Sequence, residues 1–247
     1  MKTIIHKASD RGQSKTDWLN SHHSFSFGEY HNPEKMGFGL LRVLNDDEIT
    51  PGSGFPTHPH ASMEIITIPL EGSLAHKDSE GNESTIGVGE IQIMSAGTGI
   101  SHSEFNASGS KPGRFLQIWI EPQKQNLQPT YAQKEFDPED LHNHFTTICS
   151  PNRKHGSLLI HQEAWICLGH FDQWYNLDYH FRGLEFSRTT TPNSTRGVYL
   201  FVLEGSVEIA GQNLGRRDAI EITEDSKFNL TSLEPNTQLL IIEVPLQ

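Results

Sequence analysis

Several features that mark other classes of protein are scarce in this 247-residue chain. Only two cysteines occur, Cys149 and Cys167, so a disulfide framework is not the stabilising strategy. No apolar run approaches the ~20 residues that a membrane-spanning helix needs. The start of the chain, Met1-Lys2-Thr3-Ile4-Ile5-His6, lacks the apolar core of a secretion signal. We therefore expect a cytoplasmic protein with no membrane partner.

Positive charge is also scarce. Lysine and arginine together number 19 against 31 aspartates and glutamates, which gives a formal net charge of −12. Nucleic-acid backbones are bound by basic surfaces, so this balance argues against direct binding to DNA or RNA. Histidine, in contrast, is in mild excess with 14 residues, which prompts a search for a metal site.

Long helical periodicity is nearly absent, and turn-forming residues interrupt the chain at short intervals. The segments between them are short and rich in β-branched and aromatic residues, as strands are. Examples are Gly39–Leu44, Met63–Ile68, Glu90–Met94 and Phe115–Ile120. The polar run Asp78–Glu83 is typical of a hairpin loop. The pattern predicts an all-β sandwich or barrel.

An internal repeat divides the chain. Leu70-Glu71-Gly72-Ser73 recurs as Leu203-Glu204-Gly205-Ser206, each time after one apolar strand and before another. Two related β-barrels are the simplest explanation. We predict an N-terminal barrel over residues 1–131, a polar linker over 132–154 and a C-terminal barrel over 155–247. Within the linker, Asp137-Pro138-Glu139-Asp140 has the composition of a short helix start with Asp137 as its N-cap.

Two short stretches carry the chemistry, His58-Pro59-His60 and His102-Ser103-Glu104. Residues at i and i+2 of a β-strand point to the same face of the sheet. Two such pairs on facing strands would therefore converge and supply three imidazole nitrogens and one carboxylate. This donor set suits a divalent transition metal and leaves coordination positions open for chemistry.

The repeat limits the number of such sites. Counted back from the shared tetrapeptide, His58 and His60 fall on Thr191 and Asn193 in the second copy. Counted forward, His102 and Glu104 fall near Leu230 and Ser232. Because none of these four residues is a histidine or a carboxylate, we predict one metal site per chain, in the N-terminal half.

Less specific explanations exist for each of these histidines. His58 and His60 alone would also fit an exposed pair in a proline-bracketed loop, and His142-Asn143-His144 repeats their spacing without a partner pair. Glu64 is a further candidate, either as a ligand or as a hydrogen-bond partner of a ligand histidine. His76 could line the pocket or be structural, and both cysteines are expected to be buried and apolar in role.

Several segments resemble a known family. His58-x-His60-x3-Glu64 and the run Ser95–Asn106 are similar to the two cupin motifs. The segments His23–Tyr30, Leu41–Asp47 and Gly54–His60 resemble, more narrowly, the pirin family and its bacterial quercetinase-like members. The resemblance is dense from about Trp18 to Glu121 and looser beyond the linker.

This resemblance implies a bicupin: two antiparallel, jelly-roll-like β-barrels packed face to face, with few short helices. The C-terminal barrel would be degenerate and lack the metal ligands. The family's three metal histidines and one glutamate carry over to His58, His60, His102 and Glu104, all of which are present. Family members have been assigned quercetin 2,3-dioxygenase activity, and the eukaryotic ones a nuclear role as iron-dependent transcription cofactors.

Our first hypothesis is an oxidoreductase like quercetin 2,3-dioxygenase. It would use one divalent metal per chain to cleave a flavonol, or a related enolisable aromatic, with O2. We expect Fe(II), while Zn, Ni, Co and Mn accept the same ligands. Glu104 would take the proton from the substrate hydroxyl. The pocket walls are expected to include Phe25, Phe27, Phe38, Met94 and Phe105.

Two other functions compete with catalysis. A metal- or redox-sensing protein would act as a regulatory cofactor without turnover and would bind a protein partner. A purely structural metal would instead hold the barrel closed. Access of small molecules to the metal distinguishes the enzyme from the sensor. An enzyme needs an open pocket beside the ligands, whereas a sensor can keep its metal sealed.

Overall fold

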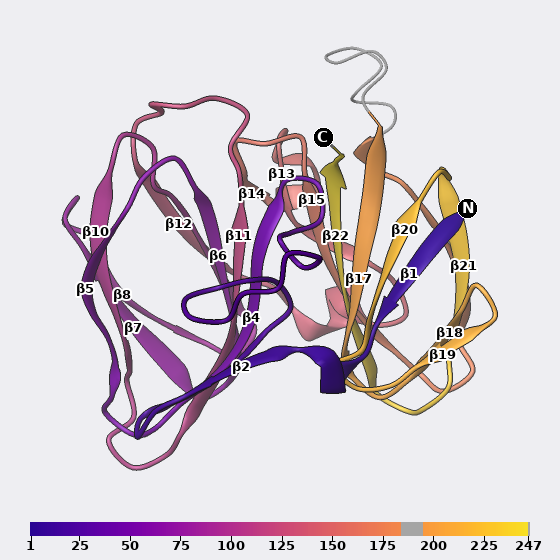
Figure 1. The fold of residues 1–247 in the computed structure, drawn as a ribbon, viewed down its shortest axis with the longest axis horizontal. Coiled ribbons are helices and arrows are strands. Elements are labelled where there is room, and N and C mark those ends of the chain that lie inside the picture. The colour runs from indigo at the N-terminus through magenta and orange to yellow at the C-terminus, as the bar shows by residue number, and fades with distance from the viewer. Residues whose placement is uncertain (184–194, 247) are drawn as a thin grey trace.

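The N-terminal half of the chain is built from two facing β-sheets. The computed structural model describes residues 1–183 and 195–246, drawn in colour in Figure 1. The larger sheet contains, in order, β12 (Thr130–Glu135), β9 (Glu90–Ser95), β6 (Glu64–Glu71), β11 (Gly113–Ile120), β4 (Leu41–Ile49), β3 (Leu19–His23) and β2 (Gly12–Lys15). The smaller sheet contains β5 (Gly54–His60), β10 (Ile100–Asn106), β7 (Ser73–Asp78) and β8 (Glu83–Gly87).

The C-terminal half repeats this plan. Its larger sheet contains, in order, β1 (Lys2–His6), β20 (Ala219–Thr223), β17 (Arg196–Glu204), β22 (Thr237–Pro245), β15 (Trp165–Phe171), β13 (Thr146–Ser150) and β14 (Leu158–Leu159). Its smaller sheet contains β16 (Asn176–His180), β21 (Lys227–Ser232), β18 (Val207–Ile209) and β19 (Gln212–Leu214). The all-β prediction is confirmed, with one correction: within each half the two sheets are separate and do not close into a barrel.

Strand alternation explains how the two halves pack. In β11, Leu116 and Ile118 point to one face of the sheet, and Phe115 and Gln117 point to the other. The first face meets the large C-terminal sheet in a shared apolar core, to which that sheet contributes residues such as Phe201. The two seven-stranded sheets therefore form the middle layers of the molecule, and the smaller sheets lie outside them (Figure 1).

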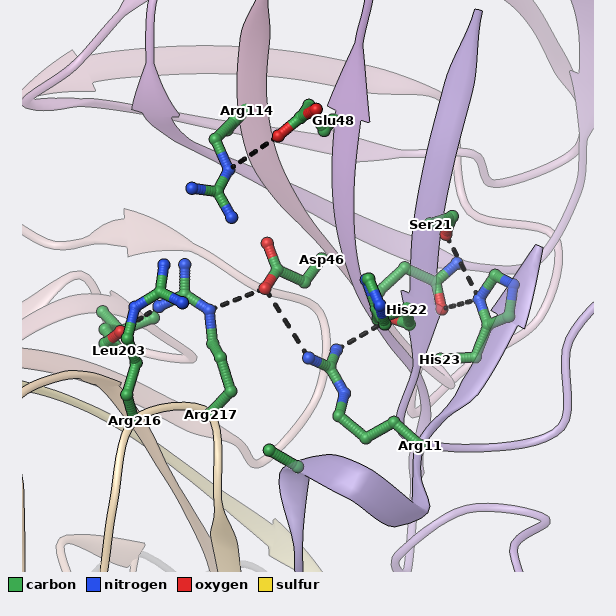
Figure 2. Close-up of polar contacts among 12 residues, drawn as sticks. Arg11, Ser21, His22, His23, Asp46, Glu48, Arg114, Leu203, Arg216 and Arg217 are labelled. Atoms are coloured by element: carbon green, nitrogen blue, oxygen red, sulfur yellow. Dashed lines mark hydrogen bonds and ion pairs between the residues drawn. The ribbon is translucent and has the colours of Figure 1, made fainter. Parts of the chain in front are cut away.

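A buried ionic cluster lies between the halves (Figure 2). Asp46 of β4 accepts a hydrogen bond of 2.6 Å from Nε of Arg217, which precedes β20, and lies 3.6 Å from Arg11. Burial acts to raise the pKa of Asp46, but the two guanidinium groups outweigh it and lower that pKa. A cation on each side thus compensates the carboxylate that the apolar interface encloses.

The predicted repeat is visible as two equivalent turns. Gly72 joins β6 to β7 and Gly205 joins β17 to β18, with φ angles of 74° and 76°. Only glycine adopts this left-handed conformation without steric cost. The shared tetrapeptide therefore encodes the same backbone reversal in both halves.

The first strand of the chain belongs to the C-terminal half, whereas β12 remains in the N-terminal half. β1 pairs with β20 of the C-terminal half, although it lies within the region 1–131 assigned to the N-terminal barrel. β12 pairs with β9 of the N-terminal half and runs beyond residue 131. Each large sheet is thus completed by a strand that the chain supplies from outside its compact repeat.

Short 3-10 helices occur among the described residues. They are the 3-10 helices Ala8–Asp10, Pro138–Leu141 and Lys154–Gly156. As predicted, Asp137 caps the second, and its carboxylate accepts a hydrogen bond from the backbone N–H of Glu139. In the same part of the chain, none of the helices has the length and apolarity required to cross a membrane.

Candidate metal centre

The two predicted ligand pairs lie on adjacent antiparallel strands. His58 and His60 belong to β5, His102 and Glu104 belong to β10, and His102 lies directly opposite His58. The prolines beside the first pair do not prevent strand formation, because β5 is an edge strand with one side free of sheet hydrogen bonds. A register shift between His102 and Glu104 marks a β-bulge, a distortion frequent beside active sites.

Three of the predicted residues form a tight cluster. The ring centroid of His58 lies 4.8 Å from that of His60 and 4.5 Å from that of His102. The centroids of His60 and His102 are 4.8 Å apart. Candidate ligand atoms from the three rings all lie within 4.8 Å of one another. The i, i+2 spacing therefore brings three imidazoles to one point.

Glu104 lies beside this cluster, deeper in the protein. Its carboxylate forms a second group within 4.8 Å together with His76 and His102. Gln117 Nε2 donates to both carboxylate oxygens at 2.9 Å, and Thr67 Oγ1 lies 3.4 Å from Oε1. Burial raises the pKa of Glu104 to about 7, although the Gln117 hydrogen bond opposes the shift. Three strands thus hold the carboxylate in place.

A chain of side-chain contacts orients His102. Asp78 Oδ2 lies 3.1 Å from His76 Nε2, and His76 Nδ1 lies 3.4 Å from His102 Nδ1. A carboxylate only accepts, so His76 donates from Nε2 and must accept at Nδ1, which leaves the Nδ1 proton on His102. His102 Nε2 then carries a lone pair, and this buried atom has no hydrogen-bond partner among the described residues.

The contacts of His58 and the burial of His60 also suit cation binding. The ring of His58 is held through Nδ1, which contacts the backbone carbonyl of Pro56 at 2.8 Å, so Nε2 is free. Burial lowers the pKa of His60 to about 4 and that of His102 to about 3, with smaller contributions from neighbouring histidines. Both rings are therefore neutral at physiological pH, the form that metals bind.

Several residues from the sequence analysis have other roles. Glu64 accepts hydrogen bonds from Ser95 Oγ at 2.6 Å and from the backbone N–H of His161 at 3.0 Å, so it joins the two halves. His142 is exposed and contacts Asp172 at 3.2 Å. Neither Glu64 nor His142 belongs to a potential metal cluster within the described ranges. Both cysteines are buried, as predicted.

A cavity of about 310 Å³ opens beside the histidines. Its walls combine metal-site residues with side chains from the large sheet and the loop after β3. They are Ser14, Leu19, Ser21, His23, Phe27, Gly28, Asn45, Asp47, Phe55, His58, His60, Glu104, Gln117 and Trp119. Its volume falls in the range of small-molecule sites, which begins at about 300 Å³.

The predicted pocket wall was mostly wrong. Only Phe27 lines the cavity, whereas Phe25 and Phe38 lie in the core between the halves. Met94 belongs to a separate buried cluster, and Phe105 is 39% exposed. The cavity instead includes Asn45 and Asp47, which were not among the predicted pocket residues. A signal existed: the polar run Asn45-Asp46-Asp47 interrupts an otherwise apolar strand.

Strand register identifies the counterparts of these residues in the C-terminal half. Alignment of the two glycine turns places His76 on Ile209, and the strand neighbours of those two residues are Glu104 and Leu230. Glu104 therefore corresponds to Leu230, not Ser232. The full set of counterparts for His58, His60, His102 and Glu104 is Tyr179, Phe181, Phe228 and Leu230.

These counterparts correct the alignment made by counting residues. His102 corresponds to Phe228, not Leu230. Thr191 and Asn193, the positions expected opposite the first histidine pair, lie outside the described residues. The conclusion drawn from that alignment is unchanged, because the corresponding positions in the second half carry no histidine and no carboxylate.

Comparison with known proteins agrees with this architecture. Residues 5–120 match the Pirin family, and residues 147–244 match the quercetinase C-terminal cupin domain. The sequence is 36% identical over 242 residues to quercetin 2,3-dioxygenase of Escherichia coli strain K12, covering 98% of both chains. The chain belongs to the pirin family. Its fold is that family's bicupin fold.

Solved pirin structures support this assignment. The crystal structure of YhhW from Escherichia coli superposes with a TM-score of 0.91 at 35% identity, covering 100% of this chain and 99% of that one. The bacterial pirin YhhW in complex with nickel(II), also from Escherichia coli, gives a TM-score of 0.90 at 34% identity and covers 100% of both chains. A relative of the same fold thus binds a divalent metal.

Proposed function

We propose that His58, His60 and His102 bind one divalent transition metal, with Glu104 as the fourth ligand. The observation that carries this proposal is the convergence of three imidazoles, together with the Nε2 of His102, which has no partner among the described residues. A buried imidazole nitrogen without a partner is costly unless something binds it. Fe(II) is the metal we expect, and the nickel complex of the Escherichia coli relative supports a divalent ion of similar size.

The function we infer is that of a dioxygenase acting on a flavonol such as quercetin, or on a related enolisable aromatic. The name of the 36% identical relative supports this reaction class. The cavity supports it too, because it reaches His58, His60 and Glu104 directly and gives a small molecule access to them. A sealed site would favour the sensing function, and a structural ion would not need a cavity.

Each side chain then has a defined task. A bound metal ion would supply Lewis acidity and redox chemistry at the open positions. Glu104 accepts the proton of the substrate hydroxyl, and Gln117 holds its carboxylate toward the cluster. Phe27 and Trp119, which pack edge to face at 5.4 Å, provide an aromatic wall for a flat ring.

The decisive experiment measures metal content and O2 consumption together. The wild-type protein, His58→Ala and Glu104→Gln are loaded anaerobically with Fe(II) and then given quercetin and O2. We expect O2 uptake and carbon monoxide release from the wild type, and loss of both from each variant. His58→Ala should also lose metal. Glu104→Gln retains the three histidine ligands, so it should keep more of its metal than His58→Ala does.

Two results would overturn the proposal. Turnover no faster than that of free Fe(II) would remove the flavonol activity, even with metal bound. A partner protein that binds stoichiometrically in only one oxidation state of the metal would favour the regulatory function instead. The substrate partners proposed here are a small aromatic and O2, and the proposed compartment is the cytoplasm.

A further inference from the structure

Asp47 is a buried carboxylic acid that faces the cavity and is not one of the proposed metal ligands. It lies on β4 and is only 2% exposed. Its Oδ1 atom has no hydrogen-bond partner in the part of the chain that the structure describes. The residue lines the cavity together with His58 and Glu104. A buried carboxyl oxygen in this position needs an explanation, because most such atoms are satisfied.

The polar groups around Asp47 already have partners. His23 Nδ1 contacts Asn45 Oδ1 at 2.8 Å and Ser21 Oγ at 3.3 Å, as Figure 2 shows for Ser21. His23 Nε2 contacts Ser14 Oγ at 2.9 Å. All four of these residues also line the cavity. This wall is therefore a hydrogen-bonded surface in which Asp47 Oδ1 is an acceptor without a partner among the described residues.

The neighbouring aspartate shows that Asp47 is not simply part of the ionic interface. Asp46 points to the opposite face of the strand, where Arg217 and Arg11 surround it (Figure 2). No ion pair of Asp47 occurs among the described residues, and burial raises its pKa to about 7. Ser21 hydrogen-bonds to the Asp47 carboxyl, which leaves Oδ1 as the atom that is open to a ligand.

We propose that Asp47 receives a second hydroxyl group of the substrate, distinct from the oxygen that is directed to the histidine cluster. The site would then select polyhydroxylated aromatics, with one oxygen function directed to the histidines and a phenolic hydroxyl directed to Asp47. This inference rests on the proposed function for the identity of the substrate's metal-binding end. Asp47 acts in recognition, whereas the reacting end of the molecule lies at Glu104.

The test compares two flavonols on two proteins. Quercetin carries hydroxyls on its outer rings, and 3-hydroxyflavone keeps only the hydroxyl beside the carbonyl. Dissociation constants are measured by equilibrium dialysis with anaerobic Fe(II)-loaded protein, so that no turnover occurs. We expect the ratio of the two constants to change by about tenfold or more between wild type and Asp47→Ala, the effect of a hydrogen bond to a charged or buried group.

Two further variants separate recognition from folding. Asp47→Asn keeps the shape and part of the hydrogen-bonding capacity, so it should give a smaller change in the ratio. Glu48→Ala removes an exposed carboxylate from the next position of the same strand and should leave the ratio unchanged. Metal content and thermal unfolding of each variant verify that the site is intact.

The outcomes distinguish this inference from the proposed function. Oxygen uptake with an unchanged ratio in both Asp47 variants would overturn the role of Asp47 and leave the dioxygenase standing. A changed ratio without oxygen uptake would support Asp47 and overturn the chemistry. Failure of wild-type protein to bind quercetin at all would overturn the inference.

Discussion

The two halves of this protein share a strand order but have opposite interiors. One row of residues across the inner face of the large N-terminal sheet is polar: His23, Asn45, Gln117, Thr67 and Gln92. Its counterpart in the C-terminal sheet is Thr147, Cys167, Ile241, Leu200 and Ile220. Both rows are buried. Burial alone therefore does not determine what an interior position contains.

The same contrast holds on the smaller sheets. In the C-terminal half the ring centroids of Tyr179 and Phe228 stack at 5.2 Å, and Phe181 lies 6.3 Å from Phe228. These rings occupy the positions of His58, His102 and His60. The aromatic side chains fill the volume that opens as a cavity in the other half. One half thus gains hydrophobic stabilisation, about 1.5–3 kcal/mol per buried apolar side chain, where the other holds a reactive centre.

Phe228→Ala tests the contrast in the C-terminal half, where the aromatic rings contribute to stability. It removes a buried ring, and the cavity left behind should lower the free energy of unfolding by about 3–5 kcal/mol. Urea denaturation measures this loss. Metal content should not change, because Phe228 lies in the other half. The matched change His102→Ala should have the reverse profile, with metal lost and stability of the metal-free protein little altered; equal loss of stability in both variants would contradict the comparison.

Asp47→Asn should stabilise the metal-free protein at neutral and alkaline pH. Burial chiefly raises the pKa of Asp47 to about 7, from 3.8, while Ser21 opposes the shift and Asp46 adds to it. The folded state therefore holds a proton that the unfolded state loses, so wild-type stability falls as pH rises from about 4 to 7 and levels off above.

Asp47→Asn lacks this loss of stability. The free energy of unfolding of the variant should therefore exceed that of the wild type by a margin that grows from about pH 4 to 7, to at most about 4 kcal/mol. The Glu104 carboxyl titrates in both proteins. Urea unfolding of both proteins at pH 5 and pH 8 provides the measurement. A pH-independent difference would show that Asp47 is not the titrating group. If Asp47 is a functional residue, Asp47→Asn should gain stability and at the same time discriminate less well between substrates.

Asp78→Asn should weaken the metal centre without removing a ligand. Asp78 accepts from His76, and His76 in turn sets the protonation of His102, so the change disturbs the lone pair directed at the metal. Loss of such a partner lowers metal affinity by about 10–100-fold. Competition of Ni(II)-loaded protein with a chelator measures it. Glu83→Gln on the neighbouring strand, an exposed carboxylate paired with Lys77, is the control and should bind metal normally.

Much of the architecture was accessible from the sequence because it depends on local patterns. Short segments rich in β-branched and aromatic residues between turn formers predicted the strands, and the repeated Leu-Glu-Gly-Ser turn predicted two related halves. The i, i+2 histidine pair predicted a shared face for His58 and His60. The prediction that the sheets close into barrels was wrong. Closure depends on hydrogen bonds between strands that are distant in the chain, and no local pattern indicates these.

Other parts of the site depended on pairing between strands far apart in the chain. His76 meets His102 because β7 and β10 are neighbours. Asp47 lines the same cavity as Glu104 because β4 belongs to the larger sheet, which faces the smaller sheet that contains β10. A one-residue change in register would turn either side chain to the other face. The sequence by itself determined which residue types could form a metal centre and in which half. Tertiary structure alone decided which carboxyl faces the cavity and which is neutralised at the interface, because Asp46 and Asp47 differ only in the face of the strand they occupy.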